Sequence, residues 1–404
     1  MVYTKDEVIT YVKQEDVKFI RLAFCDVYGT QKNIAIMPSE LERAFMVGIP
    51  FDASAIKGFE TIQKSDMVLV PDSSTLADLP WRPVPGKVVR LYCDIKYPDG
   101  KPYEVDGRHI LRKAVDKAKE IGINCNVGVE YEFYLFKTDE NGDSTDIPHD
   151  NAGYMDIAPE DKGENIRREI CFILEKMGII PESSRHEEGP GQHEVHFKYS
   201  DPLTAADNAT TFKSVVKTVA ARNGLYANFE PKPLKDKSGN GFHINISIRS
   251  DDSKEINSFM AGILEHISEI TVFLNPSAKS YERLGEKKAP KYIAWCEENR
   301  SLLIRIPAVK GAYERIELRS PDPYANPYIA YALMIYAGLD GIKNFLKPSL
   351  PARENLFNES SYTKTFKVLP LSLDEAIKEM MKSSFLAEIM PKKIIKAYST
   401  LPHC

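Results

Sequence analysis

Polar and apolar residues alternate along several short segments of the chain, and in other segments they recur at helical spacing. The first 96 residues predict one helix that starts at a capping box of Thr4 and Glu7, followed by short strands such as Val17–Phe24 and Val88–Ile95. Between these strands, Pro71–Pro85 is rich in Pro, Ser and Asp and is expected to be a loop. This part of the chain therefore predicts a small unit of one helix and short strands.

Pro and Gly residues gather in Tyr97–Gly107, which we interpret as a domain boundary. The chain is accordingly divided into a domain of residues 1–98 and a larger domain of residues 99–404. Beyond the boundary, helical and strand-like patterns alternate.

Helices in the larger domain are predicted from their apolar stripes and their capping signals. The stripes start at Ile110, Ile166 and Phe212, and a second capping box is formed by Ser372 and Glu375. The longest apolar stretch, Tyr328–Ala337, is ten residues long. A membrane span needs about 20 residues, so this stretch predicts a buried helix.

Five strands are also predicted in the larger domain, and each has charged or polar side chains on one face. They are Val129–Phe136, Gln192–Phe197, Phe242–Ile248, Ser301–Ile306 and Arg315–Arg319. Residues two apart on a strand point the same way, so each polar face follows directly from the sequence. These faces carry Glu130 and Glu132, then Gln192, Glu194 and His196, then His243, Asn245 and Ser247, then Arg305, and finally Arg315, Glu317 and Arg319.

Any one of these strands could belong to an antiparallel sheet with one face in water. Glu, His, Arg and Gln side chains are, however, costly to gather in such numbers unless they bind something. If the sheet curves so that the five faces converge, it encloses a polar cavity.

Five glutamates and one histidine make this cavity a candidate metal site: Glu130, Glu132, Glu187, Glu194, Glu317 and His243. Clustered carboxylates cannot all stay ionised without cations, because like charges raise one another's pKa values. Carboxylate oxygens with a single imidazole suit Mg²⁺ or Mn²⁺, and this set could hold about two or three ions. Arginines beside such metals are typical of phosphoryl transfer, and the candidates are Arg300, Arg305, Arg315 and Arg319.

The sequence contains neither a P-loop nor the glycine motif of dinucleotide-binding folds, so a nucleotide would have to bind in another way. The glycine-rich turn Ser238–Gly241, just before His243, would permit close approach of the backbone to a ligand.

The overall composition is that of an ordinary globular protein of 404 residues, 43% hydrophobic and 27% charged. With 58 acidic and 53 basic residues the net charge is −5, which argues against partners such as nucleic acids or anionic membranes. Lys5, Asp6 and Glu7 interrupt the N-terminal segment where a signal peptide would need an apolar run. Six cysteines without a CxxC spacing fit a reducing compartment, so we expect a cytoplasmic protein.

The motifs that contain these residues resemble those of glutamine synthetase, in particular the type I form of bacteria and archaea, across nearly the whole chain. The matching segments are Phe51–Ile56, Glu130–Phe133, His186–Glu194, Lys232–Pro233, Gly239–His243, Asn299–Pro307 and Arg315–Arg319. The resemblance implies an α+β fold with a β-grasp-like N-terminal domain and a catalytic domain on a curved antiparallel sheet. It also implies a homo-oligomer, a hexameric ring or a dodecamer, with active sites between neighbouring subunits.

The resemblance further implies a role for each site residue. One metal would be held by Glu132, Glu187 and Glu194, and the other by Glu130, His243 and Glu317. The α-carboxylate of glutamate would be bound by Arg283, with the backbone of Gly239 beside it. The phosphoryl group would face Arg300, Arg305 and Arg319, and ATP would contact Arg305, Arg315 and Ser247.

The reaction of the family uses ATP to convert the γ-carboxylate of glutamate into γ-glutamyl phosphate, from which ammonia displaces phosphate. A carboxylate such as Asp52 would remove a proton from ammonium, and the ammonia that results is the nucleophile. The residues Tyr154 and Asp66 keep the family types and are expected at the same ammonium pocket.

Two departures from the family pattern lie near that pocket. Ala55 stands where the latch motif usually has a second Ser, and the flap Gly285–Lys288 is shorter than in the family, with Lys288 in place of the Glu that closes the site. A lysine there would repel ammonium and could favour an amine that carries its own carboxylate, unless Glu286 takes over as the acid.

The chain stops at Pro402-His403-Cys404, where family members continue into a segment that ties two rings together, which favours a single ring. The first hypothesis is glutamine synthetase, and the second is a γ-glutamyl ligase that uses an organic amine or amino acid instead of ammonia. A third is a non-catalytic structural or regulatory relative, which the retention of all six metal-type ligands disfavours.

Overall fold

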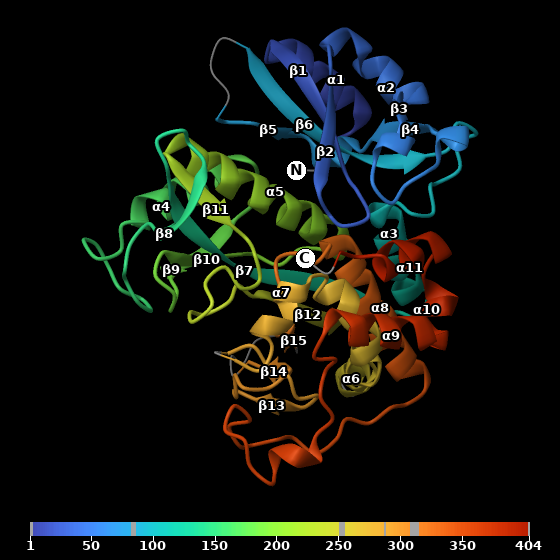
Figure 1. Cartoon of the computed structure of the whole chain (residues 1–404). Coiled ribbons are helices and arrows are strands. Elements are labelled where there is room, and N and C mark those ends of the chain that lie inside the picture. Colours follow the sequence, from blue (N-terminus) through green and yellow to red (C-terminus); the bar gives the residue numbers. More distant parts are fainter. Residues whose placement is uncertain (1–2, 82–85, 250–254, 287, 308–314, 403–404) are drawn as a thin grey trace.

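The computed structural model describes residues 3–81, 86–249, 255–286, 288–307 and 315–402. Two separate β-sheets organise this part of the chain (Figure 1). The N-terminal sheet lies at the top of the view, the larger sheet lies below it, and helix α5 runs between them. The fold is α+β, as predicted, with a β-grasp N-terminal domain and a curved, mainly antiparallel sheet in the catalytic part.

Within the described residues, the N-terminal sheet has six strands: β1 (Val17–Cys25), β2 (Gln31–Ile36), β3 (Ile49–Asp52), β4 (Asp66–Pro71), β5 (Ala77–Asp78) and β6 (Lys87–Lys96). Their order is β2-β1-β6-β4-β3, with β5 pairing to β6, and β1 runs parallel to β6. Helices α1 (Lys5–Gln14) and α2 (Leu41–Val47) accompany it. The predicted capping box of Thr4 and Glu7 at the start of α1 is confirmed.

The larger sheet has nine strands among the described residues: β7 (Asn124–Thr138), β8 (Ser144–Pro148), β9 (Pro181–His186), β10 (Gln192–Phe197), β11 (Leu225–Asn228), β12 (Phe242–Arg249), β13 (Trp295–Glu297), β14 (Ile304–Ile306) and β15 (Arg315–Leu318). The order is β13-β14-β15-β12-β7-β10-β9, and β8 and β11 also pair with β7. The long strand β7 therefore lies at the centre of the sheet, where its neighbours can bring their side chains together.

The larger domain's helices are α3 (Gly107–Glu120), α4 (Glu164–Lys176), α5 (Pro202–Arg222), α6 (Glu255–Leu274), α7 (Ala278–Arg283), α8 (Pro327–Lys343), α9 (Leu373–Lys382), α10 (Ser384–Ile389) and α11 (Lys392–Ser399). Short 3₁₀ turns are η1 (Pro38–Glu40), η2 (Ala53–Ala55), η3 (Ile62–Lys64), η4 (Ser73–Thr75) and η5 (Thr363–Thr365). The prediction that Tyr328–Ala337 forms a buried helix is confirmed by α8, in which all of these residues are buried. Within the described ranges, no helix combines the length and the apolar character that a membrane crossing requires.

Three details differ from the sequence expectations. The strand predicted at Ser301–Ile306 begins only at Ile304, because the side chain of Asn299 accepts hydrogen bonds from the backbone N–H and the hydroxyl of Ser301 and holds a turn there. Ser372 caps α9 as predicted, but the Glu375 carboxylate accepts from the N–H of Leu371, so the box is not reciprocal.

The third difference is in the predicted loop Pro71–Pro85, which contains η4 and the short strand β5; its residues 82–85 lie outside the described part. Asp72 caps η4 through its side chain, and Tyr92 donates its backbone N–H to the hydroxyl of Thr75. The Asp and Ser residues that suggested a loop thus build a hydrogen-bonded turn against β6.

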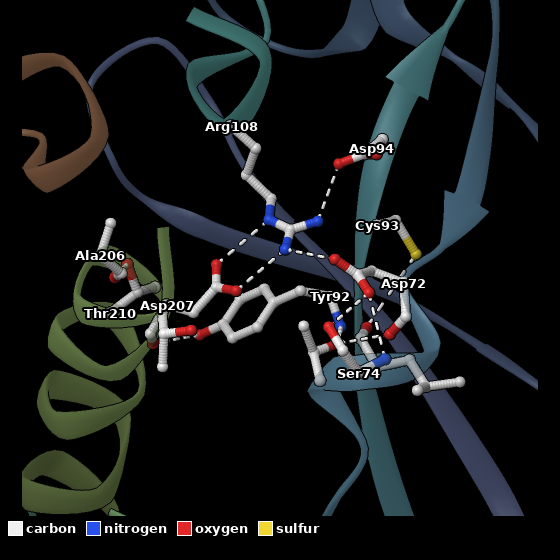
Figure 2. A network of polar contacts seen from close by, with 12 residues as sticks. Asp72, Ser74, Tyr92, Cys93, Asp94, Arg108, Ala206, Asp207 and Thr210 are labelled. Atoms are coloured by element: carbon white, nitrogen blue, oxygen red, sulfur yellow. Dashed lines mark hydrogen bonds and ion pairs between the residues drawn. The ribbon is translucent and has the colours of Figure 1, made fainter. Parts of the chain in front are cut away.

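A buried arginine joins the two sheets. Arg108, in the first turn of α3, donates through Nε and Nη2 to both oxygens of Asp207 on α5, at 3.2 and 3.0 Å (Figure 2). Its Nη1 donates to Asp94 of β6 at 2.8 Å, and its Nη2 donates to Asp72 at 2.9 Å. One guanidinium therefore holds the N-terminal sheet against the helix that underlies the larger sheet.

Candidate active site

The polar faces of the five predicted strands do converge on one side of the larger sheet. In the register of the sheet, Glu130 of β7 lies opposite His196 of β10 and also opposite His243 of β12. Glu132 lies opposite Glu194 of β10. On the neighbouring strands, Glu317 of β15 lies opposite Asn245 and Arg305. The alternation of side chains thus produces one acidic surface, as the sequence predicts.

Glu130, His243 and Glu317 form the first cluster of ligand-type atoms, all within 4.8 Å of one another. His243 Nδ1 lies 3.6 Å from Glu130 and 3.8 Å from Glu317, and this buried nitrogen has no hydrogen-bond partner among the described residues. Burial raises the pKa of Glu130, but the nearby imidazoles of His243 and His196 outweigh it, so its pKa is lowered. An orphaned imidazole nitrogen between two carboxylates fits a divalent cation.

Glu132, Glu194 and His243 form a second, overlapping cluster within the same 4.8 Å limit. Glu187 is hydrogen-bonded to Glu194, and its pKa is raised to about 9, first by burial and then by the charges of Glu132 and Glu194. The pKa of Glu194 is lowered to about 2, since His196 and Arg185 outweigh the effect of burial. The acids predicted for the two metals are therefore adjacent, and they form one continuous site.

Two cationic residues of this site were not among the predicted ligands. Arg185 on β9 donates through Nε to Glu194 at 2.6 Å and lies 3.5 Å from Glu187. His196 Nε2 lies 3.1 Å from Glu194 and 3.6 Å from Glu130. The sequence alone could have placed both residues in the site, because each stands two residues from a predicted acid on the same strand or its continuation. Their presence supplies part of the positive charge that this acidic surface needs.

Behind the site, a triad of Asp150, His186 and His193 also has metal-type ligands, but most of its ligand atoms are already used. His186 contacts Asp150 through Nε2 at 2.9 Å and the carbonyl of Glu187 through Nδ1 at 2.7 Å. His193 Nδ1 accepts from Arg167, at 2.8 Å, so its Nε2, which is buried without a partner among the described residues, carries the ring proton. These contacts fix the residues that immediately precede Glu187 and Glu194, so the triad supports the acids.

The predicted arginines divide into buried and exposed groups. Arg305 Nε and Arg319 Nη1 each donate to a different oxygen of the fully buried Glu317, both at 2.5 Å. Arg300 is exposed, and its charge contributes, after burial, to the lowered pKa of Arg305. Arg315 donates to the hydroxyl of Tyr199 at 3.0 Å and lies opposite Ser247 in the β12–β15 register.

A small pocket beside the acids contains the predicted substrate residues Arg283 and Gly239. The Arg283 guanidinium is 3% exposed and donates to the carbonyls of Ser320 and Arg319, at 2.8 and 3.4 Å. A Cβ on Gly239 would lie 2.4 Å from the carbonyl oxygen of Pro231 and 2.9 Å from Cγ of Arg283, so only glycine fits. Both residues face one pocket whose floor includes Glu132.

The flap places its lysine inside this pocket and its glutamate outside. Lys288 lines the pocket, and its ammonium lies 2.9 Å from a Glu188 oxygen and 4.7 Å from the ring centroid of Tyr154. The Glu286 carboxylate instead accepts a hydrogen bond from Lys232 at 3.1 Å. Glu188, which also lines the pocket, was not singled out from the sequence, because nothing in the strand pattern marks the residue after Glu187.

Asp52 and Asp66 lie on the other sheet, apart from the acidic surface. They face each other in the β3–β4 register, and both are exposed. Strand β3 is an end strand of the N-terminal sheet, which lies above the larger sheet (Figure 1). The hydroxyl and the N–H of Ser54 donate to Asp52, which lowers the pKa of its carboxyl. The chain alone does not bring these two acids to Glu130 or Arg283.

Comparisons with known proteins agree along the whole length of the chain. The glutamine synthetase β-grasp domain family matches residues 16–98, and the glutamine synthetase catalytic domain family matches residues 104–403. The glutamine synthetase of Clostridium saccharobutylicum is 46% identical over 403 residues, covering 96% of this chain and 91% of that protein. That of Methanosarcina mazei is 45% identical over 412 residues, covering 98% and 92%.

Solved structures give the same result. A structure described as a GmaS/ADP complex superimposes with a TM-score of 0.88 at 28% identity, over 97% of this chain and 93% of that one. A cryo-EM structure of Plasmodium falciparum glutamine synthetase has a TM-score of 0.88 at 26% identity, over 98% and 94%. With both of its domains matched and its acidic strands in register, the chain belongs to the glutamine synthetase family.

Proposed function

We propose that this chain is a glutamate–ammonia ligase, which forms glutamine from glutamate and ammonia through γ-glutamyl phosphate at the expense of ATP. The observation that carries the proposal is the meeting of Glu130, His243 and Glu317 with the paired guanidinium groups of Arg305 and Arg319. Such a meeting of hard oxygen ligands and buried arginines suits charge that develops on a transferring phosphoryl group.

We further propose that the acidic surface holds two or three Mg²⁺ or Mn²⁺ ions per site, with Glu132, Glu187 and Glu194 at one and Glu130, His243 and Glu317 at another. The orphaned Nδ1 of His243 and the raised pKa of Glu187 support this assignment. When bound, the cations would supply Lewis-acid chemistry that neutralises phosphate charge. Arg185 and His196, which contact Glu194 here, would lie beside these ligands.

The remaining assignments concern the chain's own residues. Arg283 and Gly239 would bind the α-carboxylate end of glutamate, since both face one pocket beside Glu132. Arg300, Arg305 and Arg319 would face the phosphoryl group, while Arg305, Arg315 and Ser247 would contact ATP. The last two lie opposite each other on adjacent strands at one end of the acidic surface.

Asp52 would remove the ammonium proton, with Asp66 and Tyr154 lining the same pocket. Because Asp52 and Asp66 lie at the edge of the N-terminal sheet, they would serve the site of a neighbouring subunit. We therefore propose a homo-oligomeric ring in which each active site is shared, in a protein that works in the cytoplasm. We also propose that the chain divides at residue 98 into the β-grasp N-terminal domain and the catalytic domain.

One observation favours a second acceptor, an organic amine that carries its own carboxylate. Lys288 places a positive charge in the pocket where the family has a glutamate. Its ammonium is paired with Glu188 at 2.9 Å, and both side chains are about two-fifths exposed, at 39% and 40%. The pair brings one charge of each sign to the rim, which suits a zwitterionic amine as well as a small cation.

Phosphate release from ATP and glutamate, measured with ammonium and with a panel of amines and amino acids, tests these functions. Release with ammonium at physiological levels supports ammonia as the acceptor, and release only with a carboxylate-bearing amine supports the second candidate. No release with any amine would indicate a non-catalytic protein. Lys288→Glu should raise the use of ammonium, while Lys291→Glu, a partly exposed lysine just after the flap that does not line the pocket, serves as the matched control.

A further inference from the structure

A large cavity lies between the N-terminal sheet and helix α5, apart from the acidic site. Its volume is about 750 Å³, and its walls come from β1, β2, β6 and α5. Helix α5 stacks Phe212 on Tyr131 of β7, whose neighbours Glu130 and Glu132 point to the opposite face of the sheet. The cavity and the active site therefore lie on opposite faces of the larger sheet, and their described lining residues do not overlap.

The charge of this cavity is opposite to that of the active site. Five cationic residues line it: Arg21, Lys57, Arg90, Lys213 and Lys217. No Asp or Glu is among the residues described as lining it. Burial, reinforced by the neighbouring Lys217, lowers the pKa of Lys213 to about 8. Like charges thus line this cavity, where Lys213 donates to the carbonyl of Pro323 at 2.6 Å and lies within the electrostatic influence of Asp322.

Arg90 is the buried centre of this charge. It is 8% exposed, its Nη1 donates to the hydroxyl of Thr211 at 3.1 Å, and its Nε is buried without a hydrogen-bond partner among the described residues. The nearby carboxylate of Asp207 already accepts two hydrogen bonds from Arg108 and one from Tyr328. A buried guanidinium with an unused donor is costly unless a ligand completes it.

Further cationic side chains line the same space. Arg21 and Arg90 lie side by side in the parallel β1–β6 register, on strands of the N-terminal sheet. Across the cavity, Lys213 and Lys217 stand four residues apart on α5, each 5.9 Å from the ring centroid of Phe229. The hydroxyls of α5 that line the cavity already donate within the protein, to the carbonyls of Ala206 and Ser214 and to the side chain of Gln31. The cationic groups themselves therefore approach from both walls.

We propose that this cavity binds a small organic anion with at least two negative charges, of the phosphate or carboxylate class. A volume of about 750 Å³ is within the usual range for small-molecule sites, roughly 300–1,000 Å³. Charge-assisted hydrogen bonds from guanidinium and ammonium groups on two walls are what such an anion requires. The ligand would join the N-terminal sheet to α5, beside the Arg108 contacts that already join them.

The site does not depend on the proposed catalytic function. An anion held between β6 and α5 would bias the position of the N-terminal sheet, which also carries Asp52 at its edge. The ligand would thus act on the part of the chain that we assign to a neighbouring active site, without touching the reacting groups.

Titration calorimetry on the full-length protein, freed of metal by dialysis, tests the proposal with pyrophosphate and with citrate as separate probes. Without metal the glutamates of the acidic site disfavour both anions, and an active-site control separates any binding there from binding in the basic cavity. We expect Lys217→Met and Arg90→Gln each to weaken binding at least tenfold. Lys217 is exposed, so its replacement tests the site even where replacement of Arg90 impairs folding.

Two matched controls distinguish this site from others. Lys198→Met removes an exposed lysine that does not line the cavity, and Arg300→Met removes an exposed arginine that we assign to the phosphoryl group; neither should change the affinity. Binding of pyrophosphate alone, of citrate alone or of both would identify the class of anion. Binding of neither probe, an unchanged affinity in Lys217→Met, or a loss of binding in Arg300→Met would overturn the proposal.

Discussion

Replacing Arg108 with methionine should remove much of the stability that joins the two sheets. The change keeps a long aliphatic side chain and removes the guanidinium, which is 3% exposed. Asp207 then loses both of its hydrogen bonds from Arg108 and keeps only the hydroxyl of Tyr328 at 2.6 Å. Breaking a buried ion pair by removing one partner costs about 3–5 kcal/mol, because the other charge is left uncompensated.

The other two partners of Arg108, Asp94 and Asp72, lose less stabilisation when the guanidinium is removed. Asp94 keeps Arg112 at 3.0 Å, and Asp72 keeps the hydroxyl of Ser74 at 2.6 Å. Both carboxylates are about one-quarter exposed, at 25% and 24%, so each pair contributes about 0–1 kcal/mol. We therefore expect the free energy of unfolding to fall by about 3–7 kcal/mol, a large share of the roughly 5–15 kcal/mol that proteins possess.

Urea unfolding followed by circular dichroism, at one fixed protein concentration, measures this loss. Arg112→Met is the matched control, because it removes a half-exposed cation from the same Asp94 and should cost about 0–1 kcal/mol. Adding Asp207→Asn to Arg108→Met should restore part of the stability, since it removes the unpaired charge. A loss in Arg108→Met no larger than that in Arg112→Met, without such a rescue, would refute this reasoning.

The same variant has a predictable pH dependence. Burial already raises the pKa of Asp207 above its ordinary value, and Arg108 counteracts this increase. Without Arg108 the folded-state pKa rises further above the unfolded value, so the folded protein binds a proton that the unfolded chain releases. The stability deficit of Arg108→Met should therefore shrink as the pH falls from 8 toward 5, whereas a deficit that grows over this range would contradict the assignment.

Three further outcomes are expected. Glu317→Gln should lower phosphate release by about 100-fold or more and weaken Mn²⁺ binding, and an unchanged Mn²⁺ affinity would remove Glu317 from the metal ligands. Asp52→Asn and Glu317→Gln subunits, each inactive alone, should regain up to about a quarter of the activity when randomly mixed, since intact sites then combine two neighbours; no regain would place both residues in one subunit's site. Because burial, Glu132 and Glu194 raise the pKa of Glu187 to about 9, Mn²⁺ binding at pH 8 should release a proton and weaken as the pH falls, as calorimetry in two buffers can measure.

The acidic site could be predicted because it depends on a short-range rule. On a strand, residues two apart share a face, so Glu130 and Glu132 must lie together whatever the rest of the fold does. The cross-strand partners were also predictable in kind, since Glu194 and His243 stand on strands with the same alternation. Arg185 and His196 obey the same rule: the sequence places His196 on the polar face without assigning it a role, and Arg185 was not singled out.

Other features depend on contacts that no local pattern records. Lys288 and Glu188 are 100 residues apart in the chain, and only the folded pocket shows that their charges pair. Likewise, the turn that shortens β14 rests on one side chain, that of Asn299, which an alternation pattern treats as an ordinary polar position. Arg108 and Asp207 also carry no sequence signal, because their helices meet only after both sheets have formed.

The net charge of this protein does not show how its charges are distributed in space. A net charge of −5 describes a mildly acidic chain, yet the larger sheet separates a cluster of buried glutamates on one face from a cavity lined by five cations near the other. Each group alone would be destabilised by its own repulsion, and α5 and β7 keep the two too far apart to neutralise each other directly. A ligand of opposite charge would stabilise each group further. For the glutamates the family chemistry provides divalent cations, and for the cations of the cavity we propose an anion.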